Sequence, residues 1–135
     1  MAEVIKITDQ NDIVATKAFP YASWTYPDFN PVQSRIFEIY EGNNNVAIAA
    51  STNSGKTLCA EMYMAHECRK RGGKALYIAP LRALAKQKEQ DWTNPKKKPH
   101  HFNDLKTSIC TGDYRITPKR AAELDESNII IMTPE

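Results

Sequence analysis

Short runs of apolar residues alternate with helical patterns along most of this chain of 135 residues. The segments that we expect to be strands are 46–50, 75–79, 105–110 and 128–132. Strands that are apolar throughout are typical of a parallel sheet with both faces covered, since each strand is then buried on two sides. The sequence therefore predicts an α/β fold with a mainly parallel sheet of at least four strands, arranged in three layers.

The helical patterns begin and end at residues suited to helix termini. Asn30 and Pro31 suit the N-cap and the first helical position, and Gly42 ends that pattern. Thr117 and Pro118 suit the start of a later helix in the same way. Four helices are predicted. The first follows Asn30, and the second follows the loop after residue 50 and ends near residue 71. The third and fourth cover about 81–92 and 118–124.

Residues 1–29 differ in composition from the rest of the chain. They are rich in aromatic residues and prolines and show no clear period, so we predict an irregular, packed lead-in. Residues 30–135 carry the regular alternation and are predicted to form part of one α/β domain.

The segment from Ala50 to Thr57 lies between an apolar run and a helical pattern, where a phosphate-binding loop is expected. In such a loop the backbone N–H groups and the positive end of the helix attract phosphates. Gly55 permits close approach of the chain, Lys56 can bridge the terminal phosphates, and the Thr57 hydroxyl can bind Mg²⁺. The pattern predicts a site for a nucleoside triphosphate with Mg²⁺, against the alternative of a chance Gly-Lys-Thr triplet in a surface loop.

Two positions depart from the usual G-x-x-x-x-G-K-T pattern. Ala50 stands in place of the first glycine, and Asn53 stands where many such loops have another glycine. Asparagine tolerates a positive φ better than most residues, so Asn53 is compatible with a glycine-like conformation at some cost in strain.

Five blocks in order resemble the motifs of superfamily 2 DExH helicases of the Ski-type group, which includes the HelQ-type DNA helicases and the large spliceosomal RNA helicase. They resemble the Q motif, motif I, motif Ia, motif Ib and the T-P-E block, at 29–33, 50–57, 80–85, 111–114 and 133–135. The resemblance covers about residues 28–135, and the ordered set is far more specific than motif I alone. It implies a P-loop NTPase fold of the RecA-like type, incomplete in this chain.

The resemblance also implies a role for individual residues. Gln33 would read the adenine, and Thr52, Asn53, Ser54, Gly55, Lys56 and Thr57 would hold the phosphates and Mg²⁺, with Lys56 and Thr57 as the catalytic members. Pro80, Arg82, Gly112 and Thr133 would lie along the track of one nucleic-acid strand. Loops at the carboxyl ends of parallel strands are where ligands bind in open α/β sheets, which agrees with these positions.

Some of these residues have an ordinary structural alternative. Gln33 stands three residues after Asn30 and could serve only as the partner in a capping box. Arg82 could be a solvated charge on a helix. Tyr114 could stack on a base or pack under a turn.

Motif II of the family places an Asp-Glu pair at the end of an apolar strand, where the Asp reaches the metal and the Glu orients the attacking water. Asp125 and Glu126 precede the run 128–132 instead of following one, so we do not interpret them as motif II. We expect motif II and the second RecA-like domain, a partner of this one, to lie outside this chain. The chain alone is therefore predicted to be inactive, whereas the full-length protein is predicted to be an ATP-dependent helicase.

Composition and charge exclude several classes of protein. Hydrophobic residues make up 41% and charged residues 25% of the chain, so neither a disordered nor a membrane protein is indicated. The formal net charge of +2 is too small to indicate a polyanion partner by itself. The cysteines Cys59, Cys68 and Cys110 are widely spaced, which argues against a disulfide framework or a zinc site and favours the cytosol or nucleus.

Two other classes of function remain open from the sequence. One is a non-catalytic nucleotide- or nucleic-acid-binding P-loop module complete at this length. The other is a small-molecule P-loop kinase, which the block 80–85 and the lack of an arginine-rich lid argue against.

Overall fold

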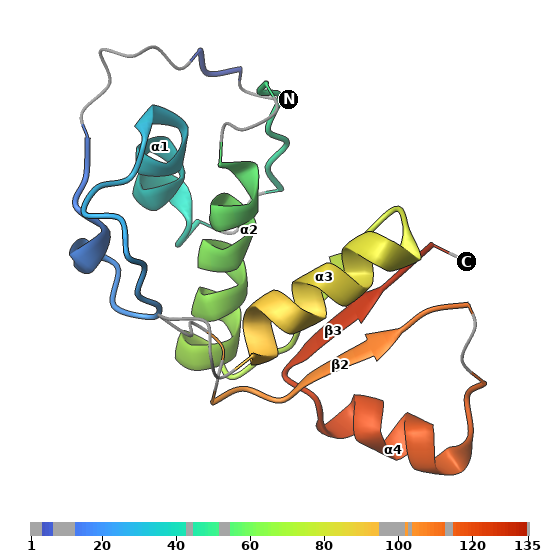
Figure 1. The fold of residues 1–135 in the computed structure, drawn as a ribbon. Helices are drawn as coiled ribbons and strands as arrows, with labels where there is room; N and C mark the ends of the chain where they lie inside the picture. The colour runs from blue at the N-terminus through green and yellow to red at the C-terminus, as the bar shows by residue number, and fades with distance from the viewer. Residues whose placement is uncertain are drawn as a thin grey trace. The chain divides into compact units, whose positions relative to one another are not determined.

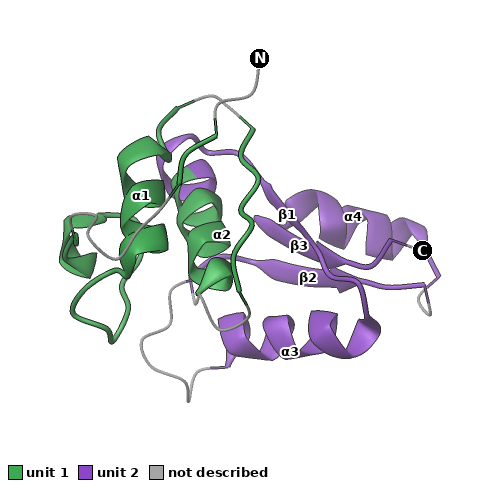
Figure 2. Cartoon of the chain, turned by 90° about the horizontal axis from the view of Figure 1, so that it is seen from above, with its two compact units in different colours: residues 1–66 green, residues 67–135 purple. Residues whose placement is uncertain are grey.

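The computed structural model describes residues 4–6, 13–42, 45–51, 55–94, 102, 104–112 and 115–134. The chain divides into two compact units, Met1–His66 and Glu67–Glu135 (Figure 2). The elements are η1 (Thr16–Ala18), α1 (Pro31–Ile39), α2 (Lys56–Ala65), η2 (His66–Lys70), β1 (Ala75–Ile78), α3 (Arg82–Thr93), β2 (Thr107–Cys110), α4 (Pro118–Glu126) and β3 (Ile129–Met132) (Figure 1). In this described part, no helix is both long and apolar enough to cross a membrane.

In the first unit, α1 packs against α2, and the segment before α1 is tied to it by hydrogen bonds. The Phe29 N–H donates to the Val14 carbonyl at 2.8 Å, and the Val14 N–H donates to the Ser34 hydroxyl at 3.1 Å. Among the described residues before α1, 13–29 therefore form η1, an isolated bridge between Ala15 and Asp28 and otherwise irregular structure that is hydrogen-bonded to α1.

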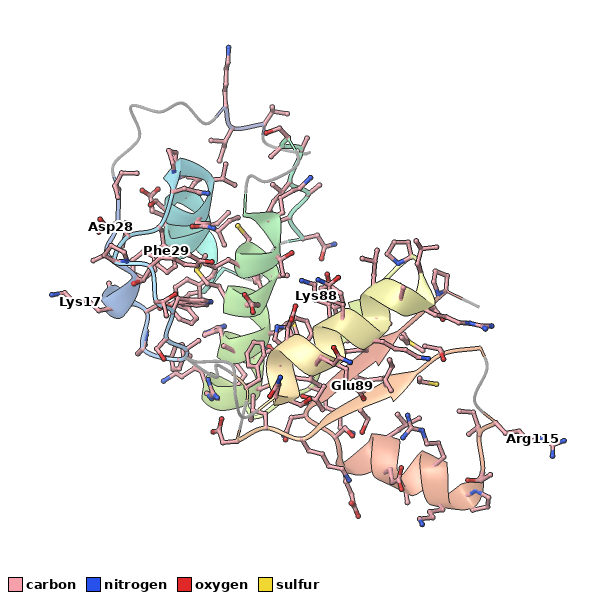
Figure 3. The ribbon with its side chains drawn as sticks, viewed as in Figure 1. Lys17, Asp28, Phe29, Lys88, Glu89 and Arg115 are labelled. Carbon is pink, nitrogen blue, oxygen red and sulfur yellow. The ribbon has the colours of Figure 1, made fainter. Side chains whose placement is uncertain are left out.

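Aromatic rings fill the space between the lead-in and α1. The Phe19 ring lies 5.0 Å from Tyr40 and 5.6 Å from Trp24, measured between centroids, and Trp24 also contacts Phe29. Phe29 is 1% exposed, and its side chain is labelled in Figure 3. Burial of these large side chains supplies the apolar area that the short helices of this unit cannot provide alone.

The helical path of α2 continues into η2, a single π-helical turn, and ends near residue 71, as predicted. Gly72 has a φ of +68°, and the Gly73 N–H donates to the Glu67 carbonyl at 2.9 Å. A left-handed glycine after the last turn satisfies carbonyls that have no partner within the helix.

The second unit contains a parallel sheet in the order β1-β3-β2. In register, Tyr77, Ile131 and Ile109 lie side by side on one face of the sheet, and Ile78, Met132 and Cys110 on the other. The sheet is thus parallel, as the sequence predicts, and its central strand β3 is apolar.

Helices lie on the two sides of this sheet, α3 on one and α4 on the other (Figure 2). On the α3 face, Trp92 is 2% exposed and lies edge-on to Tyr77 and Phe102, with centroid distances of 5.1 and 5.5 Å. On the α4 face, the hydroxyls of Ser108 and Ser127 are hydrogen-bonded at 2.5 Å. The predicted three layers are present in this unit.

The prediction of a strand at 46–50 is wrong for this structure. Residues 45–51 form no β-ladder, and the described sheet has three strands where at least four were expected. A strand is stabilised by hydrogen bonds to a neighbour, and each described strand pairs only within the order β1-β3-β2. Val46 is 42% exposed, so this apolar run is also not buried as a central strand would be.

Candidate functional site

The N-terminus of α2 begins at a glycine in the left-handed conformation. Gly55 is the N-cap, with φ +79° and ψ 27°, and no side chain of a described residue caps this end of the helix. The first N–H groups of a helix have no partner within the helix, and the helix dipole makes this end positive. The α2 N-terminus is therefore suited to an anion such as phosphate.

Gln33 connects the start of α1 to the start of α2. Its Nε2 donates to the Gly55 carbonyl at 3.2 Å. Its Oε1 accepts from the Asn30 N–H at 3.0 Å, and its own N–H donates to Asn30 Oδ1 at 2.9 Å, which completes a capping box. The capping box is thus present, and the same amide also contacts the predicted phosphate-binding loop, so its contacts are not limited to the capping box.

The Lys56 ammonium lies next to the loop backbone. Its Nζ donates to the Ala50 carbonyl at 2.9 Å, and the side chain is exposed. An ammonium group has three protons, so one donated to Ala50 leaves two for other acceptors. Thr57, the next residue in α2, is half-buried.

The other residues expected to hold the phosphates, Thr52, Asn53 and Ser54, lie outside the described residues. Those that are described come together at the α2 N-terminus: a left-handed glycine, a lysine ammonium and a threonine hydroxyl. Backbone N–H donors and an ammonium are complementary to phosphate oxygens, and a hydroxyl is an oxygen ligand of the kind that Mg²⁺ prefers. The described residues therefore fit a magnesium-bound triphosphate.

The thiol nearest in sequence to the start of α2, that of Cys59, is not a reactive thiolate. Cys59 in α2 is fully buried, and burial raises its pKa to about 11. Burial also raises the pKa of Tyr63, one turn further along α2. Both groups are therefore neutral at physiological pH, and Cys59 is part of the core.

A second group of predicted residues lies at the carboxyl edge of the sheet in the other unit. Pro80 and Arg82 follow β1, Gly112 follows β2, and Thr133 follows β3. Because the strands are parallel, their carboxyl ends meet at one edge. Pro80, Arg82 and Gly112 are exposed there, whereas the Thr133 side chain is 3% exposed and is not presented at the surface.

Asp125 and Glu126 lie in the last turn of α4 and not after a strand. Their carboxylates lie 3.8 Å from Lys74 and 3.1 Å from Lys106, respectively. This position agrees with the interpretation that the pair is not motif II.

Sequence reasoning missed one contact of the loop and one neighbour of it. The contact joins the Lys56 ammonium to the Ala50 carbonyl, a backbone atom that no side-chain pattern reveals. The neighbour is Asn30, which was identified only as an N-cap, although its Nδ2 lies 3.1 Å from the place that a Cβ on Gly55 would occupy.

Comparison with known proteins places these observations in a family. The family model for DEAD/DEAH box helicases matches residues 30–135. Activating signal cointegrator 1 complex subunit 3 from Dictyostelium discoideum is 40% identical over 82% of the chain, and DExH-box ATP-dependent RNA helicase DExH13 from Arabidopsis thaliana is 38% identical over 82%. ATP-dependent DNA helicase Hel308 from Methanocella arvoryzae is 38% identical over 97% of the chain.

The chain spans only 5% of the length of the first two relatives and 17% of the third. The match at residues 30–135 nevertheless includes all but the first residue of the five blocks that resemble helicase motifs. These matches confirm the resemblance to Ski-type DExH helicases. The chain belongs to the DEAD/DEAH box helicase family.

Proposed function

We propose that this chain forms the ATP-binding part of a helicase that uses ATP hydrolysis to separate or translocate along nucleic-acid strands. The observation that carries the proposal is the start of α2, where left-handed Gly55 has no side-chain cap and the Lys56 ammonium lies against the loop backbone. This arrangement provides positive charge and free N–H donors at one point, as triphosphate binding requires.

Within this site each residue has a distinct role. Lys56 contacts the terminal phosphates, and the Thr57 hydroxyl is a ligand of Mg²⁺, which supplies charge neutralisation for phosphoryl transfer. Thr52, Asn53 and Ser54 contribute backbone donors. The Gln33 amide retains one proton and one oxygen lone pair beyond its bonds to Gly55 and Asn30, and these can pair with the edge of adenine.

The carboxyl edge of the sheet is proposed to bind one nucleic-acid strand. Arg82 is exposed at the start of α3 and would contact a phosphate, while Pro80 and Gly112 would let the strand approach the backbone closely. For Thr133, whose side chain is buried, we propose a contact through the backbone or a role in shaping the edge.

The relatives differ in the nucleic acid that their names give, an RNA helicase in one case and a DNA helicase in another. We leave the substrate of this chain at the level of nucleic acid.

A second RecA-like domain is proposed as its partner, because ATP hydrolysis in this family requires motif II and an arginine from outside the described residues. The free thiols of Cys59, Cys68 and Cys110 support a reducing compartment, the cytosol or the nucleus.

The site is tested by titrating the purified chain with a fluorescent ATP analogue in the presence of Mg²⁺. We expect saturable binding that Lys56→Ala abolishes, because the variant lacks the ammonium. Lys70→Ala, which removes an exposed ammonium in η2, serves as the matched control and should bind as the unaltered chain does. Equal affinity of the Lys56→Ala variant and the unaltered chain would refute the site.

A further inference from the structure

We infer that Gln33 is a positioning residue for the phosphate-binding loop, and that its amide sets the direction of the Lys56 N–H whether or not a base is bound. This inference rests on the proposed nucleotide site and deepens it. The contact that carries it is the hydrogen bond from Gln33 Nε2 to the Gly55 carbonyl, 3.2 Å long.

The Gln33 amide is held in one orientation. The side chain is 8% exposed, and its Oε1 accepts the Asn30 N–H at 3.0 Å. If the amide were reversed, its NH₂ would face the Asn30 N–H, a donor against a donor. Its oxygen would face the Gly55 carbonyl, an acceptor against an acceptor, and both hydrogen bonds would be lost. The capping box of α1 therefore points Nε2 at Gly55.

The Gly55 carbonyl receives two donors, Gln33 Nε2 and the Leu58 N–H at 3.2 Å. Two donors from different directions fix the plane of the peptide that joins Gly55 to Lys56. In a trans peptide the N–H points opposite to the C=O. With the carbonyl directed at Gln33 and Leu58, the Lys56 N–H points out of the α2 N-terminus, toward the place that a phosphate would take.

This peptide needs support from elsewhere because Gly55 supplies none. Glycine rotates more freely than other residues, and Gly55 has no side chain to cap α2. The support comes from a residue 22 positions earlier in the chain, on a different helix. Without it the 55–56 peptide would sample other orientations, and the loop would lose part of its affinity for phosphates even when no base is present.

Inorganic tripolyphosphate with Mg²⁺ is the probe that separates loop positioning from base reading, since it lacks a base. Two variants of the full 135-residue chain test the inference. Gln33→Met keeps the size of the side chain and removes both polar groups. Gln33→Glu keeps an acceptor for the Asn30 N–H, as in common capping boxes, but cannot donate to the Gly55 carbonyl. Titrations in about 0.5 M NaCl screen the added charge of the glutamate.

We expect both variants to bind tripolyphosphate about tenfold more weakly than the unaltered chain, equivalent to about 1.4 kcal/mol at 25 °C. Gln33→Glu should keep a melting temperature near that of the unaltered chain, because its capping box is intact. The control is Thr117→Ala, which removes the N-cap of α4, where Thr117 accepts from the Arg120 N–H. That variant should lose stability but bind tripolyphosphate normally.

The inference is overturned if both Gln33 variants bind tripolyphosphate like the unaltered chain while binding ATP more weakly, since Gln33 would then only read the base. It is also overturned if the unaltered chain binds MgATP but not tripolyphosphate, or if Thr117→Ala weakens binding equally. In each of these cases the proposed ATP site stands. Failure of the site itself would appear separately, as unchanged ATP binding in Lys56→Ala.

Discussion

The side-chain amide of Gln33 occupies the space that a side chain on Gly55 would need. An ideal Cβ on residue 55 would lie 2.2 Å from Gln33 Nε2, closer than any ordinary contact. Gly55 also has a φ of +79°, which only glycine adopts without strain. Two independent constraints therefore exclude other residues at this position, one from the backbone and one from α1.

Substitution of Gly55 by alanine is predicted to cost more than an alanine at an ordinary left-handed position. The left-handed conformation costs about 1–2 kcal/mol for a residue with a Cβ. The displaced Gln33 amide would also lose its bond to the Gly55 carbonyl, worth about 1 kcal/mol. We expect a lower free energy of unfolding in urea and a loss of ATP-analogue affinity.

Gly72→Ala is the matched control for this prediction. Gly72 has a φ of +68°, but among the described residues no atom beyond its two chain neighbours lies within 4 Å of its ideal Cβ position. The variant should show the conformational cost alone and bind the ATP analogue normally. An equal loss of stability in the two variants would mean that contact with Gln33 contributes nothing.

Truncation of Trp92 is predicted to destabilise the second unit strongly. Trp92 is 2% exposed and contacts Tyr77 and Phe102, so Trp92→Ala leaves a large cavity between α3 and the sheet. Such substitutions cost about 3–5 kcal/mol. Leu81→Ala, at a side chain that is 61% exposed, should change the free energy of unfolding by less than about 0.5 kcal/mol. Urea unfolding followed by circular dichroism measures both, and similar midpoints would contradict this packing.

The stability of the first unit is predicted to fall at alkaline pH, partly through Cys59. Burial raises the pKa of this thiol from 9.0 to about 11. The unfolded chain therefore loses the proton at a lower pH than the folded chain does. Between these two values the folded state binds more protons, so the free energy of unfolding decreases as pH rises.

Replacing Cys59 by alanine removes this contribution. Unfolding midpoints measured from about pH 8 to 11 should fall less steeply for Cys59→Ala than for the unaltered chain, although the variant starts from a lower stability because a buried side chain is shortened. Burial raises the pKa of Tyr40 to about 12, and this tyrosine contributes equally to the pH dependence of stability in both proteins. Parallel curves for the two proteins would rule out a role of Cys59.

Arg82 is predicted to contact a nucleic-acid phosphate. Arg82→Ala should weaken binding of single-stranded oligonucleotides to a similar extent for all sequences and reduce the slope of log affinity against log salt by about 1. Lys17→Ala is the control, because Lys17 lies in the other unit and projects away from the chain (Figure 3). Fluorescence anisotropy at several salt concentrations measures the slope. If the two variants behaved alike, Arg82 would be an ordinary solvated charge.

Much of the local structure could be predicted because it depends on neighbours in sequence. Asn30, Pro31 and Gln33 encode the start of α1 by their side chains alone, and the capping box forms as their spacing indicates. The pair Thr117 and Pro118 begins α4 in the same manner. The apolar runs at 75–79, 105–110 and 128–132 correspond to strands, with ends that differ by up to two residues.

The strand expected at 46–50 shows the limit of such reasoning. It is as apolar as the segment 75–79, which does contain a strand, but composition does not provide a neighbour for its N–H and C=O groups. Whether an extended segment becomes a strand depends on a partner that is distant in sequence. Among the described residues no strand offers one to 45–51.

The sequence by itself determined the α/β class, the parallel sheet and the family, because each follows from residue types at fixed spacings. Only the tertiary structure decided that Gln33 contacts Gly55, that Lys56 donates to the Ala50 carbonyl and that the Thr133 side chain is buried. These contacts join backbone and side-chain atoms of separate segments. Their distances are fixed by how the segments pack in space, which local sequence patterns do not encode.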